Sequence, residues 1–448
     1  MSDQIRLKKG LDLPIAGAAL CEVTRRVAPG LVAVKPTDFR GMVPRLLVKE
    51  GDPVKAGTPL FADKKNTAMV FCSPVSGTVE AVVRGDKRKL LAVTVKADGK
   101  NESVRFDVPK ISSLDKKGMT DLLLQCGLWP CLKQRPYGTV ADPEAEPKAI
   151  FISGMNTAPL GADRDFTLKD EMAAVQAGID ALGRLTKGGV HFSLSAKNYA
   201  GSEFHKLTGV IFHQFEGPHP AGNVGVQINH ISPINKGEVV WTVDLPLVAV
   251  IGRLFLKGIY DDRRIIAVAG PAAVNPSYAE VPAGVCMKDL SAFFGEGDVR
   301  VVSGDVLSGE AVGADGFLGI YDDQVSLLKE GNYYEMFGWI NPFRSKKFSV
   351  SRAYPAFLRH KKYDMDTNEN GGERPFLMND VYGKVLPMDI YPLYLFKACL
   401  AGDLDKMEQL GIYEVIEEDV ALCEYVCPSK IAIQDIVRKG IELMMKEM

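Results

Sequence analysis

Two cysteines near the C-terminus have the spacing of iron–sulfur ligands. Cys423 and Cys427 are separated by three residues and Pro428 follows, as in the second half of the run C-x2-C-x2-C-x3-C-P. The other two ligands of such a run would fall at Glu417 and Val420. Valine cannot bind iron, and one carboxylate is a poor substitute for a soft thiolate. The sequence therefore predicts a degenerate cluster loop that holds no metal; the alternative is a chance cysteine pair on a helix.

A second group of residues has the chemistry to hold a flat carbonyl compound. Trp129 offers an aromatic face, and Arg135 and Tyr137 offer hydrogen-bond donors, with Leu132 between them. This combination would suit a quinone headgroup. The alternative is that Trp129 anchors a loop on the core while Arg135 is solvated. The run from Gly217 to Gly222 is likewise either a ligand loop or a stiff turn.

Most other catalytic and cofactor signatures are missing from the sequence. It has no H-E-x-x-H zinc motif, no G-x-S-x-G nucleophile elbow and no G-x-G-x-x-G dinucleotide loop. The run Gly183–Gly188 is followed by Gly189, where a Walker loop needs lysine. Six histidines are dispersed, and His213 with His219 is the only close pair. We therefore predict no bound flavin, nicotinamide or metal, and no independent hydrolase.

Composition and charge exclude several classes of partner. The 448 residues carry 54 Lys and Arg against 56 Asp and Glu, so no overall basic field attracts nucleic acid. Eight dispersed cysteines and an N-terminus without an apolar core segment predict a reduced, cytoplasmic protein. The most apolar stretch, 245–256, contains Pro246 and Arg253 and is too short to span a bilayer. Membrane association is thus expected only through a partner.

The chain is expected to be an α/β multidomain protein that begins with a β domain at 1–107. Residues 41–107 match the runs V-x-x-G-D-x-V-x-x-G-x-x-L and S-P-x-x-G-x-V, and resemble the biotinyl/lipoyl barrel hybrid. In such carriers a modified lysine stands at the tip of a hairpin. Here that position is Asn66, beside Lys64 and Lys65. We predict the fold without a covalent swinging arm.

Three further domains are predicted from the order of strands and helices. Alternating strands and helices indicate a Rossmann-like α/β domain at 108–255, with a helix over 170–185. A β-rich stretch with one short helix near 285–294 indicates a β-grasp (SLBB-like) domain at 256–331. The remainder, 332–448, is predicted to be a helical ferredoxin-like remnant. Its last helix has an apolar face made of Ile433, Ile436, Val437, Gly440, Ile441 and Met444.

Several runs together resemble one family. They are Leu7–Gly17, Gly217–Gly222, Phe337–Trp339 with Lys347–Val350, and Glu418–Pro428, and they resemble the A subunit of the sodium-translocating NADH:quinone oxidoreductases. The resemblance implies a peripheral component of a six-subunit respiratory pump, on the cytoplasmic face of the bacterial inner membrane. It also implies ubiquinone or menaquinone as the substrate. FAD, FMN and the 2Fe-2S centre would belong to partner subunits, and the membrane-embedded B subunit would be the chief partner. The chain also resembles the flavin-binding subunit of complex I with eroded motifs.

Three functional hypotheses follow. The first is an accessory subunit that shapes the quinone site around Trp129, Leu132, Arg135 and Tyr137 and contributes no catalytic residue, flavin or metal of its own. The second is a purely structural adaptor that binds no quinone. The third is a self-sufficient flavin or cluster oxidoreductase, which would be coloured when purified.

Overall fold

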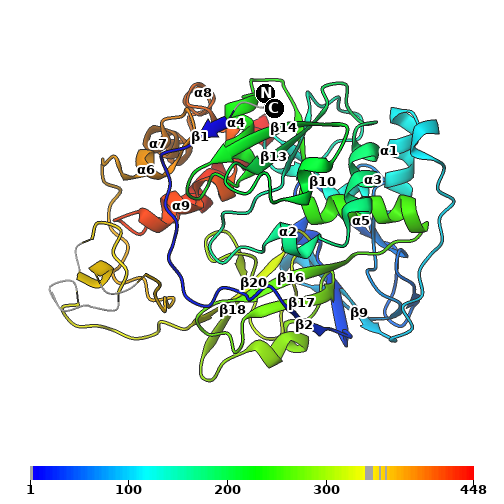
Figure 1. Cartoon of the computed structure of the whole chain (residues 1–448), viewed down its shortest axis with the longest axis horizontal. Helices are drawn as coiled ribbons and strands as arrows, with labels where there is room; N and C mark the ends of the chain where they lie inside the picture. The colour runs from blue at the N-terminus through cyan, green and yellow to red at the C-terminus, as the bar shows by residue number, and fades with distance from the viewer. Residues whose placement is uncertain (1–3, 339–346, 353–354, 359–360, 448) are drawn as a thin grey trace.

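The computed structural model describes residues 4–338, 347–352, 355–358 and 361–447. Figure 1 shows a barrel-like β unit, a central sheet flanked by helices, a second sheet beneath it, and a group of C-terminal helices. The α/β multidomain class predicted from the sequence is confirmed. No helix in the described part of the chain is both long and apolar enough to cross a bilayer.

The first unit is a sandwich of two small sheets, as its dense glycine and proline turns predicted. One sheet has the order β3 (Leu31–Val34), β9 (Leu90–Ala97), β8 (Gly77–Arg84) and β5 (Pro53–Val54). The other consists of β4 (Pro44–Leu46), β6 (Pro59–Asp63) and β7 (Val70–Cys72). Asn66 lies in the turn between β6 and β7, where its side chain accepts a hydrogen bond from the amide of Ala68 at 3.1 Å. Asn66 thus occupies the hairpin position that the sequence predicted for it.

The central sheet has the order β1-β14-β13-β12-β15-β10-β11. Strands β12 (Ile150–Ser153), β13 (Val190–Ser195), β14 (Val210–Glu216) and β15 (Val240–Val243) are parallel, and β10 (Leu132–Arg135) and β11 (Thr139–Val140) extend them antiparallel. Ile150 and Ile152 share a core with α3 (Met172–Leu182) and α5 (Leu245–Lys257), whereas Phe151 packs with α4 (Val224–Ile231). Because neighbouring residues of a strand point to opposite faces, helices cover both sides of this sheet.

Helices α3 and α5 approach each other through a pair of glycines. A Cβ atom added to Gly252 would lie 1.7 Å from the carbonyl oxygen of Ala174. One added to Gly178 would lie 2.1 Å from the carbonyl oxygen of Val248. The apolar stretch that was too short to cross a membrane is therefore a buried helix of the core, in contact with its neighbour along the backbone.

The third unit is a mixed sheet in the order β19-β18-β20-β16-β17-β2. Its members are β16 (Arg263–Ala269), β17 (Ser277–Pro282), β18 (Val299–Ser303), β19 (Glu310–Ala311) and β20 (Gln324–Lys329), joined by β2 (Val23–Arg26). The expected short helix is a 3-10 helix at Met287–Phe293. Sequence reasoning did not assign β17, because all but one of its side chains are buried and it shows no alternation of apolar and polar residues.

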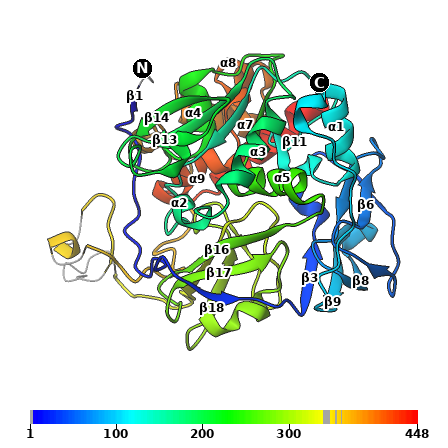
Figure 2. The same cartoon turned by 45° about the vertical axis from the view of Figure 1, so that its right-hand side comes forward.

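The N-terminal residues pair outside the barrel-like unit. Strand β1 (Gln4–Arg6) runs parallel to β14, and β2 runs parallel to β17. Between them, the stretch Leu7–Gly17, which we call the strap, crosses the molecule (Figure 2). Strands β1 and β2 therefore belong to sheets outside the barrel-like unit, and the predicted unit 1–107 stays a prediction. The other boundaries, at 108–255, 256–331 and 332–448, stay predictions.

The C-terminal helices pack around a core of their own. They are α6 (Val381–Val385), α7 (Pro392–Ala401), α8 (Leu404–Gln409), α9 (Glu417–Val426) and α10 (Ile433–Glu447). The apolar face predicted for α10 is confirmed, since its six residues are the buried ones. Between Gly331 and Asp380, the described residues contain a short 3-10 turn at Pro355–Leu358 and isolated β-bridges at Tyr363 and Asp366, but no α-helix.

Candidate functional site

The segment that was predicted to hold a quinone runs along the edge of the central sheet. A 3-10 turn at Trp129–Cys131 leads into β10, which pairs antiparallel with β15, and a tight turn at Tyr137 leads into β11. Trp129 and Leu132 are fully buried, Arg135 is 2% exposed, and Tyr137 is half-buried. The four residues lie on one segment, but only the Tyr137 end reaches the surface.

Both the indole N–H and the aromatic ring of Trp129 contact other residues of the protein core. Its indole N–H donates to the carbonyl oxygen of Ala141 at 2.8 Å. Its ring meets Trp241 edge-on, with centroids 5.4 Å apart and planes at 86°. Edge-to-face packing of this kind and a satisfied N–H are typical of an anchoring tryptophan. The geometry matches the alternative in which Trp129 holds a loop on the core.

Arg135 forms a buried charge cluster with the start of α9. Its guanidinium donates to Asp419 at 2.6 Å and to Glu418 at 2.5 Å. Burial alone would lower the pKa of Arg135, but the two carboxylates outweigh it and the pKa is raised. The expectation that Arg135 would be solvated if Trp129 anchors a loop is wrong. Sequence reasoning had no signal for this pairing, because the partners are 283 and 284 positions away.

Tyr137 stands where this segment turns at the surface. Its ring lies edge-on to that of Tyr413, with centroids 6.2 Å apart. Its carbonyl oxygen accepts a hydrogen bond from Arg40 at 3.3 Å. Burial, together with the charge of Glu408, raises the pKa of the Tyr137 phenol. The hydroxyl therefore stays protonated at neutral pH, and it shares a side-chain hydrogen bond with Tyr413, whose own hydroxyl donates to Glu408 at 2.6 Å.

The predicted degenerate cluster loop is helix α9 and its C-terminal end, and its residues make contacts within the protein. Glu417, the first of the missing ligand positions, forms ion pairs with Arg40 at 2.7 Å and Arg438 at 3.1 Å. Val420, the second, is fully buried in the helical core. Both missing ligand positions are thus committed to structure. Among the described residues, no group of three or more His, Cys, Asp or Glu side chains is arranged to hold a metal.

The two cysteines of the loop are buried beside Tyr382. The Tyr382 hydroxyl and the Cys427 sulfur are 3.1 Å apart, and Cys423 and Cys427 are each 1% exposed. Burial raises the pKa of the Cys423 thiol far above its ordinary value, so this thiol is neutral at physiological pH. Metal ligation needs the thiolate, which this surrounding disfavours. The pair behaves as apolar filling of the core.

The loop at the carboxyl end of β14 packs against the chain itself. Ligands of open α/β sheets bind at the carboxyl ends of the strands. Here the loop after β14 places His219 against the strap, and the amide of Leu11 donates to the carbonyl oxygen of His219 at 2.8 Å. A Cβ on Gly10 would lie 2.3 Å from that oxygen, and the His219 ring nitrogen contacts Thr157 at 3.2 Å. The run from Gly217 to Gly222 therefore holds the strap in place through His219.

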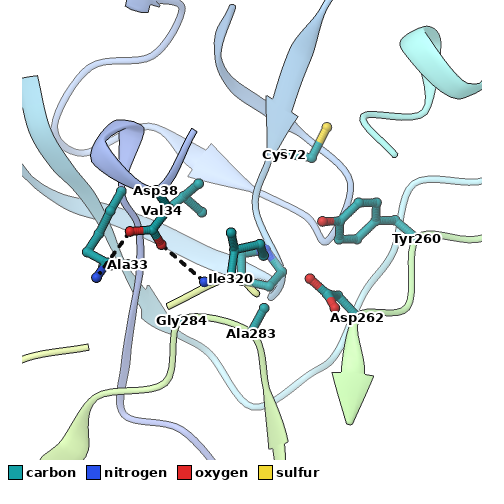
Figure 3. Close-up of a pocket in the computed structure, with 11 residues that line it drawn as sticks. Ala33, Val34, Asp38, Cys72, Tyr260, Asp262, Ala283, Gly284 and Ile320 are labelled. Atoms are coloured by element: carbon teal, nitrogen blue, oxygen red, sulfur yellow. Dashed lines mark hydrogen bonds and ion pairs between the residues drawn. The ribbon is translucent and has the colours of Figure 1, made fainter. Parts of the chain in front are cut away.

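Two cavities lie near the junction of the first three units. One, of about 10 Å³, is enclosed by Asp38, Cys72, Tyr260 and Asp262, and Figure 3 shows Tyr260 and Asp262 facing into it. It has room for about one water molecule. The other is a groove of about 260 Å³ between α5 and β16, lined by charged side chains of both signs. Neither cavity is lined by any residue of 126–137.

We expect one carboxyl near this junction to make stability depend on pH. Asp322 is half-buried against Ser303, and desolvation raises its pKa to about 6. Because this pKa is higher than in the unfolded chain, the contribution is fullest below about pH 4 and is lost as pH rises through 6. Asp322→Asn, which still accepts from Ser303, should be more stable than wild type by about 2 kcal/mol at pH 8 and equal to it near pH 4.

Urea denaturation across this pH range, with exposed Asp86→Asn as the control, would measure the effect. A stability difference that stays constant with pH would contradict the role of the Asp322 carboxyl.

Comparison with known proteins identifies relatives along the whole chain. Residues 5–98 match the NqrA N-terminal barrel-sandwich hybrid domain, residues 114–260 the NqrA second alpha/beta domain, and residues 265–314 the NQRA C-terminal domain. The chain is 39% identical over 440 residues to the A subunit of the Na(+)-translocating NADH-quinone reductase of Yersinia pestis, covering 97% of this chain and 98% of that one. The A subunits of the same reductase from Klebsiella pneumoniae and Vibrio atlanticus are 40% and 37% identical, with coverage of at least 95% of each chain.

Among solved structures, an NAD+-reducing [NiFe]-hydrogenase in the air-oxidized state is similar over 76% of this chain and 65% of that one. The identity is 12% and the TM-score 0.36, which is too low to carry an argument.

Proposed function

Because the chain belongs to the NqrA family, the A subunits of the Na(+)-translocating NADH-quinone reductase, we propose that it is a peripheral subunit on the cytoplasmic face of the bacterial inner membrane that helps form the quinone site. The chain is a subunit of an enzyme whose substrate is a quinone. In our proposal the whole complex transfers electrons from NADH to quinone. It couples this transfer to the export of Na+. FAD, FMN and the 2Fe-2S centre reside in partner subunits, and the membrane-embedded B subunit is the chief contact.

The residues at the positions where a cofactor would bind make structural contacts instead. This supports a role in which the subunit carries no redox group of its own. Glu417 is held by two arginines, Val420 fills a core, and the strap packs against the loop that follows β14. Catalysis by this subunit would then be positional, since holding a reactant in place accelerates a reaction without a reacting group.

Within our proposal, the quinone headgroup sits at the Tyr137 end of the segment. The Tyr137 hydroxyl stays protonated at neutral pH and would exchange its hydrogen bond with Tyr413 for one to a quinone carbonyl, while the guanidinium of Arg40 lies beside the same turn. Trp129 and Leu132 are buried, so their role would be to hold β10 in the core. Arg135 would fix the position of Tyr137 by fastening the end of β10 to α9. The half-buried phenol at this turn is the observation that carries the assignment.

Substituting Tyr137 in the assembled complex tests the site. Tyr137→Phe removes only the hydroxyl, and we expect the KM for quinone to rise roughly tenfold, as for the loss of one hydrogen bond in a partly buried site. Reduction of an artificial acceptor by NADH should be unchanged, because that reaction bypasses the quinone site. Tyr394→Phe, at an exposed tyrosine of α7, is the matched control. An unchanged KM for quinone would remove Tyr137 from the site.

A purely structural adaptor is the second candidate, and the burial of Trp129 and Arg135 favours it. A photoreactive quinone analogue distinguishes the two functions. Labelling at or next to Tyr137 supports a quinone site on this subunit. Labelling of other subunits alone, combined with loss of assembly when Arg135 is replaced, supports the adaptor.

A further inference from the structure

Two histidines on neighbouring strands of the central sheet form a pair that the proposed function does not use. His191 lies on β13 and His213 on β14, and these strands run parallel and side by side (Figure 1). Nδ1 of His191 and Nε2 of His213 are 2.8 Å apart. The two residues are separated by 22 positions, so their spacing in the sequence gave no sign of the pair.

The two imidazole rings meet edge to edge in one plane. Their planes differ by 6°, and their centroids are 5.1 Å apart. The centroid separation exceeds the N···N distance by 2.3 Å, about twice the distance from the centre of an imidazole ring to one of its nitrogens. The two nitrogens therefore lie on the line between the ring centres. One proton is shared between two nitrogens of a type that binds metals.

The surroundings of His191 fix the orientation of its ring. The ring stacks on that of Phe151, with centroids 4.6 Å apart and planes at 21°. Because Nδ1 faces His213, Nε2 is the nitrogen that hydrogen-bonds to the backbone of Gly188. Metal-binding histidines almost always donate one ring N–H to such a partner and bind the ion through the other nitrogen. His191 is thus already oriented as a ligand.

The pair is available to an ion from solvent. Burial, and then the charge of His213, lower the pKa of His191, so its imidazole is neutral at neutral pH. An imidazole binds a metal only in this neutral form. Both histidines are half-buried, and Ile211, which pairs with His191 across the strands, is 46% exposed. An ion can therefore reach the two rings without opening the core.

We propose that His191 and His213 together bind one divalent transition-metal ion of the Ni2+ or Cu2+ type. Imidazole suits these metals, which take ligands at right angles to one another. With metal–nitrogen bonds of about 2.0 Å, two such ligands lie about 2.8 Å apart, which is the separation found here. The rings then need only turn until both lone pairs converge on an ion at the exposed side.

Water would complete the coordination of this ion. Among the residues that the structure describes, no third His, Cys, Asp or Glu is placed to join the pair. The ion would link β13 to β14 and would take no part in electron transfer. The proposal goes beyond the quinone role and does not rest on Tyr137.

Calorimetric titration of the full chain with Ni2+ tests the proposal. Cys21, an exposed free cysteine, is replaced by serine in every sample, because its thiolate is itself a metal ligand. One Ni2+ should bind per chain, and Mg2+ should not bind, since it prefers oxygen ligands. His191→Gln and His213→Gln should each weaken Ni2+ binding by more than about tenfold, because each removes one of two protein ligands.

A matched histidine variant keeps the test specific. His230 is exposed on α4, and its ring contacts the carbonyl oxygen of Val226 at 2.9 Å. His230→Gln should leave Ni2+ binding unchanged. Thermal unfolding checks that every variant is folded, and Ni2+ should raise the unfolding temperature of the parent chain but not that of His191→Gln or His213→Gln.

Chemical modification gives a measurement that does not depend on the folding of any variant. Diethyl pyrocarbonate acylates accessible imidazoles, and peptide mass spectrometry locates the modified residues. Ni2+ should protect His191 and His213 in the unaltered chain and leave His230 reactive. Equal Ni2+ affinity in the three histidine variants, or no greater protection of the pair than of His230, overturns the proposal.

Discussion

Replacing Arg135 with alanine is expected to destabilise the protein by about 3–5 kcal/mol, as for breaking a buried ion pair from one side. The side chain of Asp419 has no exposed surface and would lose its cationic partner. Glu418 would lose its contact as well. A buried carboxylate without a partner carries a large desolvation cost, which is why the loss exceeds the worth of the pair itself. Urea denaturation of the isolated chain measures this change.

Two comparisons isolate the cause. Arg135→Met combined with Asp419→Asn removes both charges and should recover most of the lost stability, because no charge is then buried alone. Arg40→Ala removes a partner of Glu417 on the same helix, but Arg40 is about one-third exposed and Glu417 keeps Arg438. Arg40→Ala should therefore cost about 1 kcal/mol. An equal loss from Arg135→Ala and Arg40→Ala would contradict the importance of burial.

Gly252→Ala is the second change with a large expected effect, a loss of more than about 3 kcal/mol. The new methyl group would lie 1.7 Å from the carbonyl oxygen of Ala174, a backbone atom that cannot rotate away. Helices α3 and α5 would have to separate, and the core they form with β12 would lose contacts along the whole interface. Guanidinium denaturation of the purified variant, or pulse proteolysis if little soluble protein is made, measures the loss.

The matched control is Gly183→Ala, at the end of α3. A methyl group there would meet its nearest neighbour, the carbonyl oxygen of Ile179, at 3.4 Å, an ordinary contact distance. This variant should be as stable as wild type or slightly more stable, because alanine restricts the unfolded chain. Gly178→Ala should resemble Gly252→Ala. Wild-type stability in both of the latter variants would show that the helices are not in backbone contact.

Local pattern was enough to predict much of the architecture. The barrel hybrid is recognisable from its glycine and proline turns, and the α10 face from the helical spacing of Ile433, Val437 and Met444. Asp403 and Gly411, residue types typical of helix starts and ends, flank α8. These features depend on neighbours within a few residues, which sequence periodicity captures.

Long-range pairing set the limit of the sequence reasoning. Nothing near Gln4 indicates that it will pair with Gln214, and nothing near Arg135 indicates Asp419. Residue types at Trp129 and Arg135 suit a ligand as well as they suit a core anchor. Burial separates these alternatives, and burial depends on parts of the chain that are distant in sequence. The sequence could therefore propose a segment for the quinone site, which stays a prediction, while the burial of its residues needed the fold.

The strap has a consequence for how the protein is made. The strap is made well before two of the residues that hold it, since Gly10 donates to Lys384 and Ala16 to Tyr363. These partners are synthesised when most of the chain already exists. Strands β14 and β17 become available to β1 and β2 much earlier, so Gly10 and Ala16 wait longest, and this part of the strap is fastened only after Tyr363 and Lys384 have been made.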